Sequence, residues 1–535
     1  MGFAPLDYAI LFIYLVGVTV FGVWVGKRQR NTRDYFLGDR NLPWTAVCFS
    51  VVATETSTLT FISIPGLAYL TNLNFLQITL GYLIGRIIIS KTLLPAYYRG
   101  ELYTAYELLR ERFGSRMQRF SSMIFQITRL LADGVRLFAT AIPLAVITGW
   151  SYSTCIIIIA LFTIIYTYIG GIRAVVWMDV IQMAIYIGGA ILAGFVLLDK
   201  LPNGWSDVVN AAQADNKFQF FYLGFENSLI DFFQINYTFL SGILGGAFLS
   251  MASHGSDQLI VQRLLSCNDL KSSQKALIMS GVIVIFQFAL FLVLGLMLYT
   301  YYGGIDIRSD EVLPRFIVEG LPIGVSGTII AGVFAAAMST LSGSLNSLAS
   351  ASMLDFIKPK WGANWSEERE LLISRIVTFV WGLVFIAGAM LFKDKDNPVV
   401  ELGLAIASFT YGGLLGTFFL GSFYAKAREN DALVAMWGAI FFMTWLIGQQ
   451  GVVLTIIVIL NILAGYWIWT RVHSRKHRIF QMIWTSFLLG LIISVGSPQI
   501  AWPWYVAIGC TMTWLIGVGL SYHNKPLPES EIRKS

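Results

Sequence analysis

The sequence has few charged residues for its length. Asp, Glu, Lys and Arg make up 13% of its 535 residues, against about 25% in a typical soluble protein, and 56% of the residues are hydrophobic. This composition excludes a soluble globular protein and predicts a chain that crosses the lipid bilayer many times. A soluble face that is both basic and rich in aromatic residues is also missing, which argues against nucleic-acid binding.

Cysteine and histidine are equally scarce, with four of each. The cysteines lie far apart and form no CxxC pair, so we expect buried free thiols rather than disulfides or a zinc site: Cys48, Cys155, Cys267 and Cys510. The apolar segments hold no nucleophile–base set and no zinc-spaced histidines, so an enzyme is not expected. The first apolar run lacks the basic start of a cleavable signal and is expected to remain as a span. No feature indicates an obligate protein partner.

Apolar runs of about 20 residues, which is the length of one helical crossing of a bilayer, recur along the whole chain. We predict about fifteen spans on this criterion. Their approximate limits are 5–25, 43–70, 74–98, 120–148, 153–170, 176–198, 234–255, 276–302, 323–353, 371–392, 397–421, 431–448, 451–469, 479–495 and 504–521.

The charges of the connecting segments predict an orientation in the membrane. Basic residues gather in segments 26–40, 98–119 and 470–478, whereas segment 199–233 is acidic. Because basic loops remain on the cytoplasmic side, the N-terminus is expected outside the cell and the C-terminal segment 531–535 inside. The expected location is the plasma membrane.

The stretch 50–69 is polar although it lies within an apolar span. Glu55 is the only formally charged residue between positions 41 and 85, hydroxyl side chains surround it, and Pro65-Gly66 follows. Polar groups at this depth must face protein or water. One interpretation is a helix interrupted in mid-membrane, which exposes backbone carbonyls to a cation. The other is a continuous buried helix whose hydroxyls bond to their own i−4 carbonyls.

A second polar segment lies between residues 331 and 350. At helical spacing its polar side chains fall on two adjoining faces, with Ser339, Ser342 and Asn346 on one and Thr340, Ser344 and Ser347 on the other. The small residues around them suit close helix packing. Alternatively, the hydroxyls of Ser339 and Thr340 complete an oxygen shell for a hard monovalent cation.

Charged residues also occur inside two further predicted spans. Asp179 is either a solvated carboxylate at a helix end or part of a cation path near the cytoplasmic side. Asp133 and Arg136 are three residues apart and can pair with one another on a helix. Otherwise Arg136 can offer its planar guanidinium to a carboxylate or a pair of hydroxyls on a solute.

Six motifs, in this order, resemble those of the sodium:solute symporter family, which includes sodium–glucose, sialic acid, proline and iodide carriers. They are Asp34–Trp44, Ala53–Gly66, Leu102–Leu109, Gly170–Gln182, Asp257–Arg263 and Ala335–Ser347. The resemblance covers most of residues 1–430. It implies an all-α polytopic membrane protein of about 13–15 transmembrane helices, built on the inverted five-helix repeat of the leucine transporter.

The resemblance also implies how the chain is divided. Residues 1–42 form a peripheral first span and a cytoplasmic loop, and residues 43–198 form the first repeat. An extracellular loop, 199–233, leads to the second repeat, 234–421. Residues 422–535 form peripheral C-terminal spans and a cytoplasmic tail.

In this family a broken helix and a hydroxyl-bearing helix hold the sodium ion. The resemblance assigns this role to the carbonyls of Ala53, Thr56 and Ala336 and to the hydroxyls of Ser339 and Thr340. Some members bind a second sodium near the aspartate that is Asp179 here, with two further hydroxyls. This chain has one of them, Ser342, and Gly343 in place of the other, so we expect one ion per cycle.

The substrate cavity implied by the resemblance is lined by Glu55, Ser57, Thr60, Phe75, Thr79, Arg136, Ser253 and His254. Ser253 and His254 stand where related sugar carriers have an aromatic gate, and Glu55 stands where they have an uncharged residue. Arg136 lies near the position of the carboxylate-binding arginine of sialic acid carriers. A zwitterionic or acidic, hydroxyl-rich solute therefore fits at least as well as a hexose, unless Glu55 and Arg136 neutralise one another.

The function implied is sodium-coupled secondary active symport, in which a small polar organic solute is imported by alternating access with Na+ as the coupling ion. A proton-coupled carrier that uses Glu55 or Asp179 is one alternative. A sensor or channel that does not accumulate solute is another.

Overall fold

The computed structural model describes residues 4–27, 29–100, 102–391, 399–448, 452–495 and 497–526. Within these ranges every regular element is a helix, apart from one isolated bridge between Leu42 and Cys267. Nine of the described helices are long and apolar enough to cross a membrane, and one bent pair makes a tenth. The predicted all-α membrane architecture is therefore confirmed. The four cysteines are buried and unbridged, as expected.

A helix occupies each of the predicted spans. The long helices are α1 (Pro5–Gly26), α3 (Trp44–Glu55), α4 (Thr58–Leu70), α5 (Leu76–Lys91), α8 (Ser115–Thr148), α9 (Tyr152–Lys200), α12 (Gly246–Gly255), α14 (Leu270–Tyr302), α16 (Val325–Ala351), α18 (Glu367–Leu391), α19 (Val399–Phe423), α20 (Glu429–Ile447), α21 (Val452–Arg471), α22 (Arg475–Ser494) and α23 (Trp504–Ser521). The shorter helices are α2 (Thr32–Leu37), α6 (Leu93–Tyr97), α7 (Ala105–Arg112), α10 (Trp205–Ala214), α11 (Leu229–Gln234), α13 (Gln258–Leu265), α15 (Ser309–Glu319) and α17 (Lys358–Trp361).

Some residues of the predicted segments lie outside the described residues. They include the end of the span 371–392, the starts of the spans 397–421 and 451–469, and the cytoplasmic tail 531–535. The predicted boundaries of the two repeats remain predictions.

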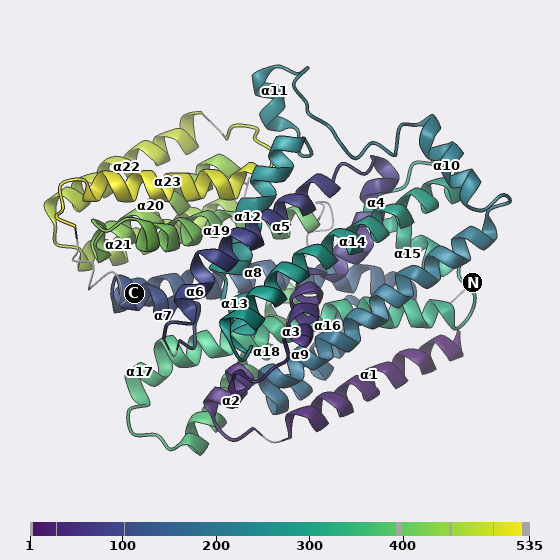
Figure 1. Ribbon diagram of the computed structural model, residues 1–535, viewed down its shortest axis with the longest axis horizontal. Helices are drawn as coiled ribbons and strands as arrows, with labels where there is room; N and C mark the ends of the chain where they lie inside the picture. Colours follow the sequence, from purple (N-terminus) through teal and green to yellow (C-terminus); the bar gives the residue numbers. More distant parts are fainter. Residues whose placement is uncertain are drawn as a thin grey trace. The chain divides into compact units, whose positions relative to one another are not determined.

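The chain forms two compact units. The first comprises Met1–Thr79, Arg129–Tyr222 and Gln262–Gly403, and the second comprises Leu80–Thr128, Leu223–Val261 and Leu404–Ser535. In the first unit α16 packs along α9, and α1 packs against both of them (Figure 1). In the second unit α20 packs against α21, α22 and α23 (Figure 1).

α1 supports α9 and α16 directly. Gly26 of α1 meets Gly170 of α9 so closely that a Cβ at Gly26 would lie 2.0 Å from the Gly170 Cα. At the other end of α1, the buried carboxylate of Asp7 accepts hydrogen bonds from the backbone N–H groups of Gly324 (2.7 Å) and Gly327 (2.8 Å). These N–H groups belong to the unsatisfied first turn of α16, so Asp7 caps that helix from a neighbouring one.

The two spans predicted at 153–170 and 176–198 are the two halves of α9. These helical segments meet at Gly171, whose φ of 51° and ψ of −151° are not helical. A side chain could not adopt this conformation without strain, and a Cβ at Gly171 would lie 2.3 Å from the Tyr35 carbonyl oxygen. Residues of both halves pack against the same point of α1, since a Cβ at Gly22 would lie 2.7 Å from Tyr166 and 3.3 Å from Met178. The chain therefore folds back at a single glycine, where the prediction had a short loop.

The polar span 43–70 is interrupted, as the first of the two interpretations predicted. α3 and α4 meet at an angle of 63°. α3 ends at Glu55, and the next residue, Thr56, has a φ of −86° and a ψ of 86°, which are not helical. Ser57 then caps α4 by accepting a hydrogen bond from the Thr60 N–H. The i−4 hydroxyl bonds of the second interpretation also occur, from Thr54 to Ser50 (2.7 Å), but the helix is not continuous.

Candidate functional site

The break between α3 and α4 leaves two backbone carbonyls without their helical donors. In a continuous helix the Ser57 N–H would bond to the Ala53 carbonyl, but it donates to the Glu55 carbonyl instead (3.1 Å). The Thr60 N–H would likewise bond to the Thr56 carbonyl, but it donates to the Ser57 hydroxyl (3.4 Å). The carbonyls of Ala53 and Thr56 are two of the three that are predicted to ligate sodium. An oxygen released from its helical bond can serve a hard cation.

The hydroxyl pair on α16 is buried and oriented by neighbouring acceptors. The Ser339 hydroxyl donates to the Asp179 carboxylate (2.6 Å), and the Thr340 hydroxyl donates to the Ala336 carbonyl (3.2 Å). A hydroxyl that donates a hydrogen bond to an acceptor leaves the lone pairs of its oxygen available to a cation. The arrangement therefore suits oxygen ligation at Ser339.

The break and α16 are in direct contact. The Thr58 hydroxyl, on the first residue of α4, donates to the Val333 carbonyl of α16 (3.1 Å). Ser57 and Thr58 also line one small cavity together with Ala337 and Thr340. The structure thus brings together the two segments from which the sequence predicted a sodium site. The ligand set itself remains a prediction.

Asp179 is fully buried, so the interpretation as a solvated carboxylate at a helix end is wrong. Besides Ser339, its carboxylate accepts hydrogen bonds from the Ser50 hydroxyl and from the Arg263 guanidinium (3.0 Å). Both charged side chains of this pair are 0% exposed. Arg263 also donates to the Ser50 hydroxyl (2.9 Å), so one buried network joins α3, α9, α13 and α16.

The second residue proposed for a further ion, Ser342, bonds to its own helix through the Ser339 carbonyl (3.0 Å). Ser342 therefore adjoins the buried network, because Ser339 also donates to Asp179, which pairs with Arg263. A second sodium remains an open prediction, and Gly343 contributes no hydroxyl to it.

Removal of Arg263 is expected to destabilise the folded protein. Arg263→Gln would leave Asp179 buried without its counter-charge, at a cost of about 3–5 kcal/mol. The melting temperature of the purified variant in detergent measures this effect. The double variant Arg263→Gln/Asp179→Asn should recover part of the loss, because it removes the uncompensated charge. An unchanged melting temperature in the single variant would show that the ion pair is not needed for stability.

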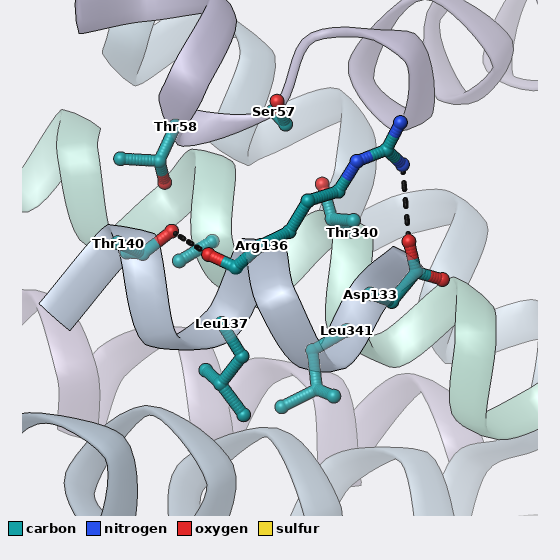
Figure 2. Close-up of a pocket in the computed structure, with 9 residues that line it drawn as sticks. Ser57, Thr58, Asp133, Arg136, Leu137, Thr140, Thr340 and Leu341 are labelled. Carbon is teal, nitrogen blue, oxygen red and sulfur yellow. Dashed lines mark hydrogen bonds and ion pairs between the residues drawn. The ribbon is translucent and has the colours of Figure 1, made fainter. Parts of the chain in front are cut away.

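Arg136 lies in the cavity at the break. The cavity is lined by Ser57, Thr58, Asp133, Arg136, Leu137, Thr140, Ala337, Thr340 and Leu341. Figure 2 shows the Arg136 side chain extending across it, with Ser57 and Thr340 on opposite sides in this view. The space holds little more than a water molecule in this conformation, so an organic solute requires its walls to move apart.

Arg136 is paired with a carboxylate of its own helix. Its Nη1 group donates to the Asp133 carboxylate at 3.0 Å (Figure 2). The pairing expected from the i, i+3 spacing is therefore confirmed, and the partner of Arg136 is Asp133 rather than Glu55. Arg136 also lines the cavity, and its side chain is 22% exposed, so the pairing leaves it within reach of a solute, whose binding there remains a prediction.

The other predicted substrate residues of the first unit lie around the break or beyond α4. Glu55 ends α3 and is half-buried, and Thr60 lies 3.4 Å from the Ser57 hydroxyl. Phe75 stacks on Phe288 with ring centroids 5.2 Å apart, and the Thr79 hydroxyl bonds to the Leu76 carbonyl (2.8 Å). These four are not among the residues that line the cavity.

The last two predicted substrate residues, Ser253 and His254, belong to the second unit. Both are on α12, where the buried His254 ring bonds through Nδ1 to the Ser253 hydroxyl (2.8 Å) and to the Ser250 carbonyl (3.1 Å). These local bonds match the role of a hydrogen-bonded packing residue. Their part in solute binding remains a prediction.

The sequence did not single out several residues that the site contains. Thr58 and Ser344 stand out in the sequence only as members of hydroxyl-rich segments, and Arg263 only as part of a motif. No sequence feature marks Gln287 of α14, whose amide donates to the Thr56 hydroxyl at the break. The signal for Arg263 is Asp179 itself, because a buried carboxylate in a membrane needs a counter-charge.

Comparison with known proteins identifies the family. The profile of the sodium:solute symporter family matches residues 35–439. The chain belongs to the sodium:solute symporter family. It is therefore a multi-pass membrane transporter that couples solute movement to sodium, and it is not an enzyme.

Relatives of this symporter carry several solutes. It is 30% identical to the sodium/sialic acid symporter NanT of Aliivibrio fischeri, over 83% of this chain and 88% of that protein. It is 29% identical to the sodium/sialic acid symporter SiaT of Proteus mirabilis, over 81% of this chain and 88% of that protein. The human sodium/iodide cotransporter is 27% identical, over 83% of this chain and 70% of its own length.

Solved structures agree with the fold. A substrate-bound, outward-open, Na+-coupled sialic acid symporter superposes with a TM-score of 0.79 at 27% identity, covering 98% of this chain and 99% of that one. Mhp1, a nucleobase-cation-symport-1 family transporter, superposes with a TM-score of 0.52 at 14% identity, which supports the fold alone. The predicted leucine-transporter-like fold is confirmed.

Proposed function

We propose that this symporter imports an acidic, hydroxyl-bearing organic solute, such as a sialic acid, together with sodium across the plasma membrane. The observation that carries the proposal is the position of Arg136. Its guanidinium lines the same cavity as Ser57 and Thr58 at the helix break and Thr340 on α16. A guanidinium group, which pairs well with carboxylates, thus lies beside hydroxyls that can bind a polyhydroxylated solute.

The proposed sodium ligands are the carbonyls of Ala53, Thr56 and Ala336 and the hydroxyls of Ser339 and Thr340. The lost helical bonds at the break and the contact of Thr58 with α16 support this set. Sodium bound there would hold the break against α16. Because Thr340 also lines the cavity, a bound sodium and a bound carboxylate would attract one another across a short distance.

The proposed mechanism is alternating access. Sodium favours the outward-open state, the solute carboxylate binds Arg136 beside it, and the repeats then rock to open the site inward. The N-terminus is proposed to lie outside the cell. Proton coupling through Glu55 or Asp179 is not needed, since Asp179 has a buried cationic partner, Arg263.

Uptake into proteoliposomes tests the proposal. An inward sodium gradient should drive accumulation of N-acetylneuraminate, and replacing sodium with choline should abolish it. The methyl ester of the same sugar, which lacks the negative charge, serves as the matched control and should be transported poorly. Equal uptake of the acid and the ester would contradict recognition through Arg136.

The number of sodium ions can be read from the charge that moves. With one sodium per singly charged anion, no net charge crosses the membrane, so an imposed potential should leave uptake unchanged. A second sodium would add one charge, and about 2.3 kcal/mol of driving force per 100 mV. Uptake measured under a potassium diffusion potential distinguishes the two cases. Stimulation by an inside-negative potential would contradict the expectation based on Gly343.

A further inference from the structure

We propose that the Asp133 carboxylate competes with the solute carboxylate for the Arg136 guanidinium. The solute carboxylate then replaces Asp133 at the guanidinium, and Asp133 limits the affinity of the site for anions. This inference rests on the proposed function, since it assumes an acidic solute bound at Arg136. It assigns to Asp133 a role in setting specificity and release.

The contacts of Asp133 make such an exchange possible. The carboxylate is 2% exposed and lies in the interior of α8. One oxygen, Oδ1, accepts the hydrogen bond from Arg136 (3.0 Å), while the other, Oδ2, accepts one from the Ser344 hydroxyl of α16. Arg129, one turn earlier on α8, donates to both oxygens, at 3.5 Å from Oδ1 and 3.4 Å from Oδ2. Asp133 thus has two partners besides Arg136.

The two members of the pair are not equally bound, because Asp133 has three partners and Arg136 has a single carboxylate partner. If Arg136 turned toward a solute, Asp133 would keep Ser344 and Arg129, so its charge would stay compensated. Among the described residues, Arg136 contacts no carboxylate other than Asp133. A guanidinium at this depth needs an anionic partner, so the solute must supply one when Arg136 turns away from Asp133.

The charge of Asp133 has two opposing effects on the transport cycle. In the empty site it compensates Arg136, which would otherwise be an unpaired cation within the membrane. In the loaded site it repels the solute carboxylate, because two carboxylates that share one cationic group disfavour each other. Repulsion of this kind weakens binding and favours release of the solute, which each turnover requires.

Two variants should shift the affinity in opposite directions. Asp133→Asn keeps the shape and one acceptor oxygen but removes the charge, so N-acetylneuraminate should bind about tenfold tighter and be released more slowly. Ser344→Ala removes a donor from Asp133, which should then hold Arg136 more firmly and weaken binding several-fold. Ser347→Ala, a buried serine bonded within its own helix to Ser344 (3.2 Å), is the matched control for Ser344→Ala.

Equilibrium binding of radiolabelled N-acetylneuraminate to the purified protein in saturating sodium measures these shifts, with its methyl ester as the neutral probe. Tighter acid binding in Asp133→Asn and weaker binding in Ser344→Ala, with no change for the ester, would support the inference. If wild type binds the acid but Asp133→Asn binds it equally or more weakly, Asp133 is merely structural and the inference fails alone. If wild type binds the acid no better than the ester, the proposed function fails and the inference fails with it.

Discussion

The double substitution Ser339→Ala/Thr340→Ala should abolish sodium-dependent uptake. Both hydroxyls are buried on α16, and the change removes two of the five proposed sodium ligands. Hydrogen-bonding groups that contact a charge contribute roughly 1.5–3 kcal/mol each, so the apparent sodium affinity should fall by roughly a hundredfold or more. The backbone carbonyls at Ala53 and Thr56 would remain but could not complete the oxygen shell.

The sodium concentration for half-maximal uptake, and sodium binding by thermal stabilisation, measure this loss. Ser347→Ala is a suitable control, because it removes a buried serine hydroxyl two turns along the same helix and should leave sodium dependence unchanged. The fold should also survive the double substitution, since Asp179 keeps its bonds to Ser50 and Arg263. A double variant with wild-type sodium dependence would rule out the proposed site.

The substitution Arg136→Gln should abolish high-affinity binding of acidic solutes while sodium still binds. Truncating a charge that is hydrogen-bonded at a desolvated site costs about 2–5 kcal/mol, which corresponds to a loss of roughly thirtyfold to several-thousandfold in affinity. Asp133 would keep Ser344 and Arg129, so the variant should fold. Arg136→Lys should have an intermediate effect, because an ammonium group supplies the charge without the planar fork.

Solute affinity and sodium affinity must be measured separately on the Arg136 variants. The expected pattern is a large rise in the KM for N-acetylneuraminate with a near-normal stabilisation by sodium alone. Arg315→Gln, the same change at an exposed arginine paired with Glu319, is the control and should behave as wild type. Equal loss of sodium and solute binding in Arg136→Gln would indicate a structural defect instead of a binding residue.

The candidate site shows why some features could be predicted from the sequence and others could not. The polar stretch 50–69 left two structures open, an interrupted helix and a continuous buried one, because hydroxyls in a membrane can bond either to a ligand or to their own helix. The structure shows the interruption. The two faces of α16 were predictable from helical spacing, and they point as expected to different partners: Ser339 contacts Asp179, and Ser344 contacts Asp133. The identity of those partners was not predictable, since they come from helices 160 and 211 residues away.

One of the two interpretations of Asp179, the solvated helix end, failed for a related reason. Its sequence position, a few residues after a glycine pair, is typical of a solvated helix end. The chain instead folds back at Gly171, and the second half of α9 carries Asp179 into the interior. Burial of a carboxylate depends on whether a distant cation is available, and Arg263 supplies it only once the chain has folded.

By itself, the sequence determined that this protein is an all-α membrane protein, that the span 43–70 carries polar residues in mid-membrane, and that α16 carries hydroxyls at helical spacing. These features follow from local composition and periodicity, to which the bilayer responds directly. Only the tertiary structure decided that Asp179 pairs with Arg263, that Arg136 is shared between Asp133 and the cavity, and that Thr58 joins the break to α16. Those pairings depend on the distance between side chains on different helices, which packing sets and sequence spacing does not.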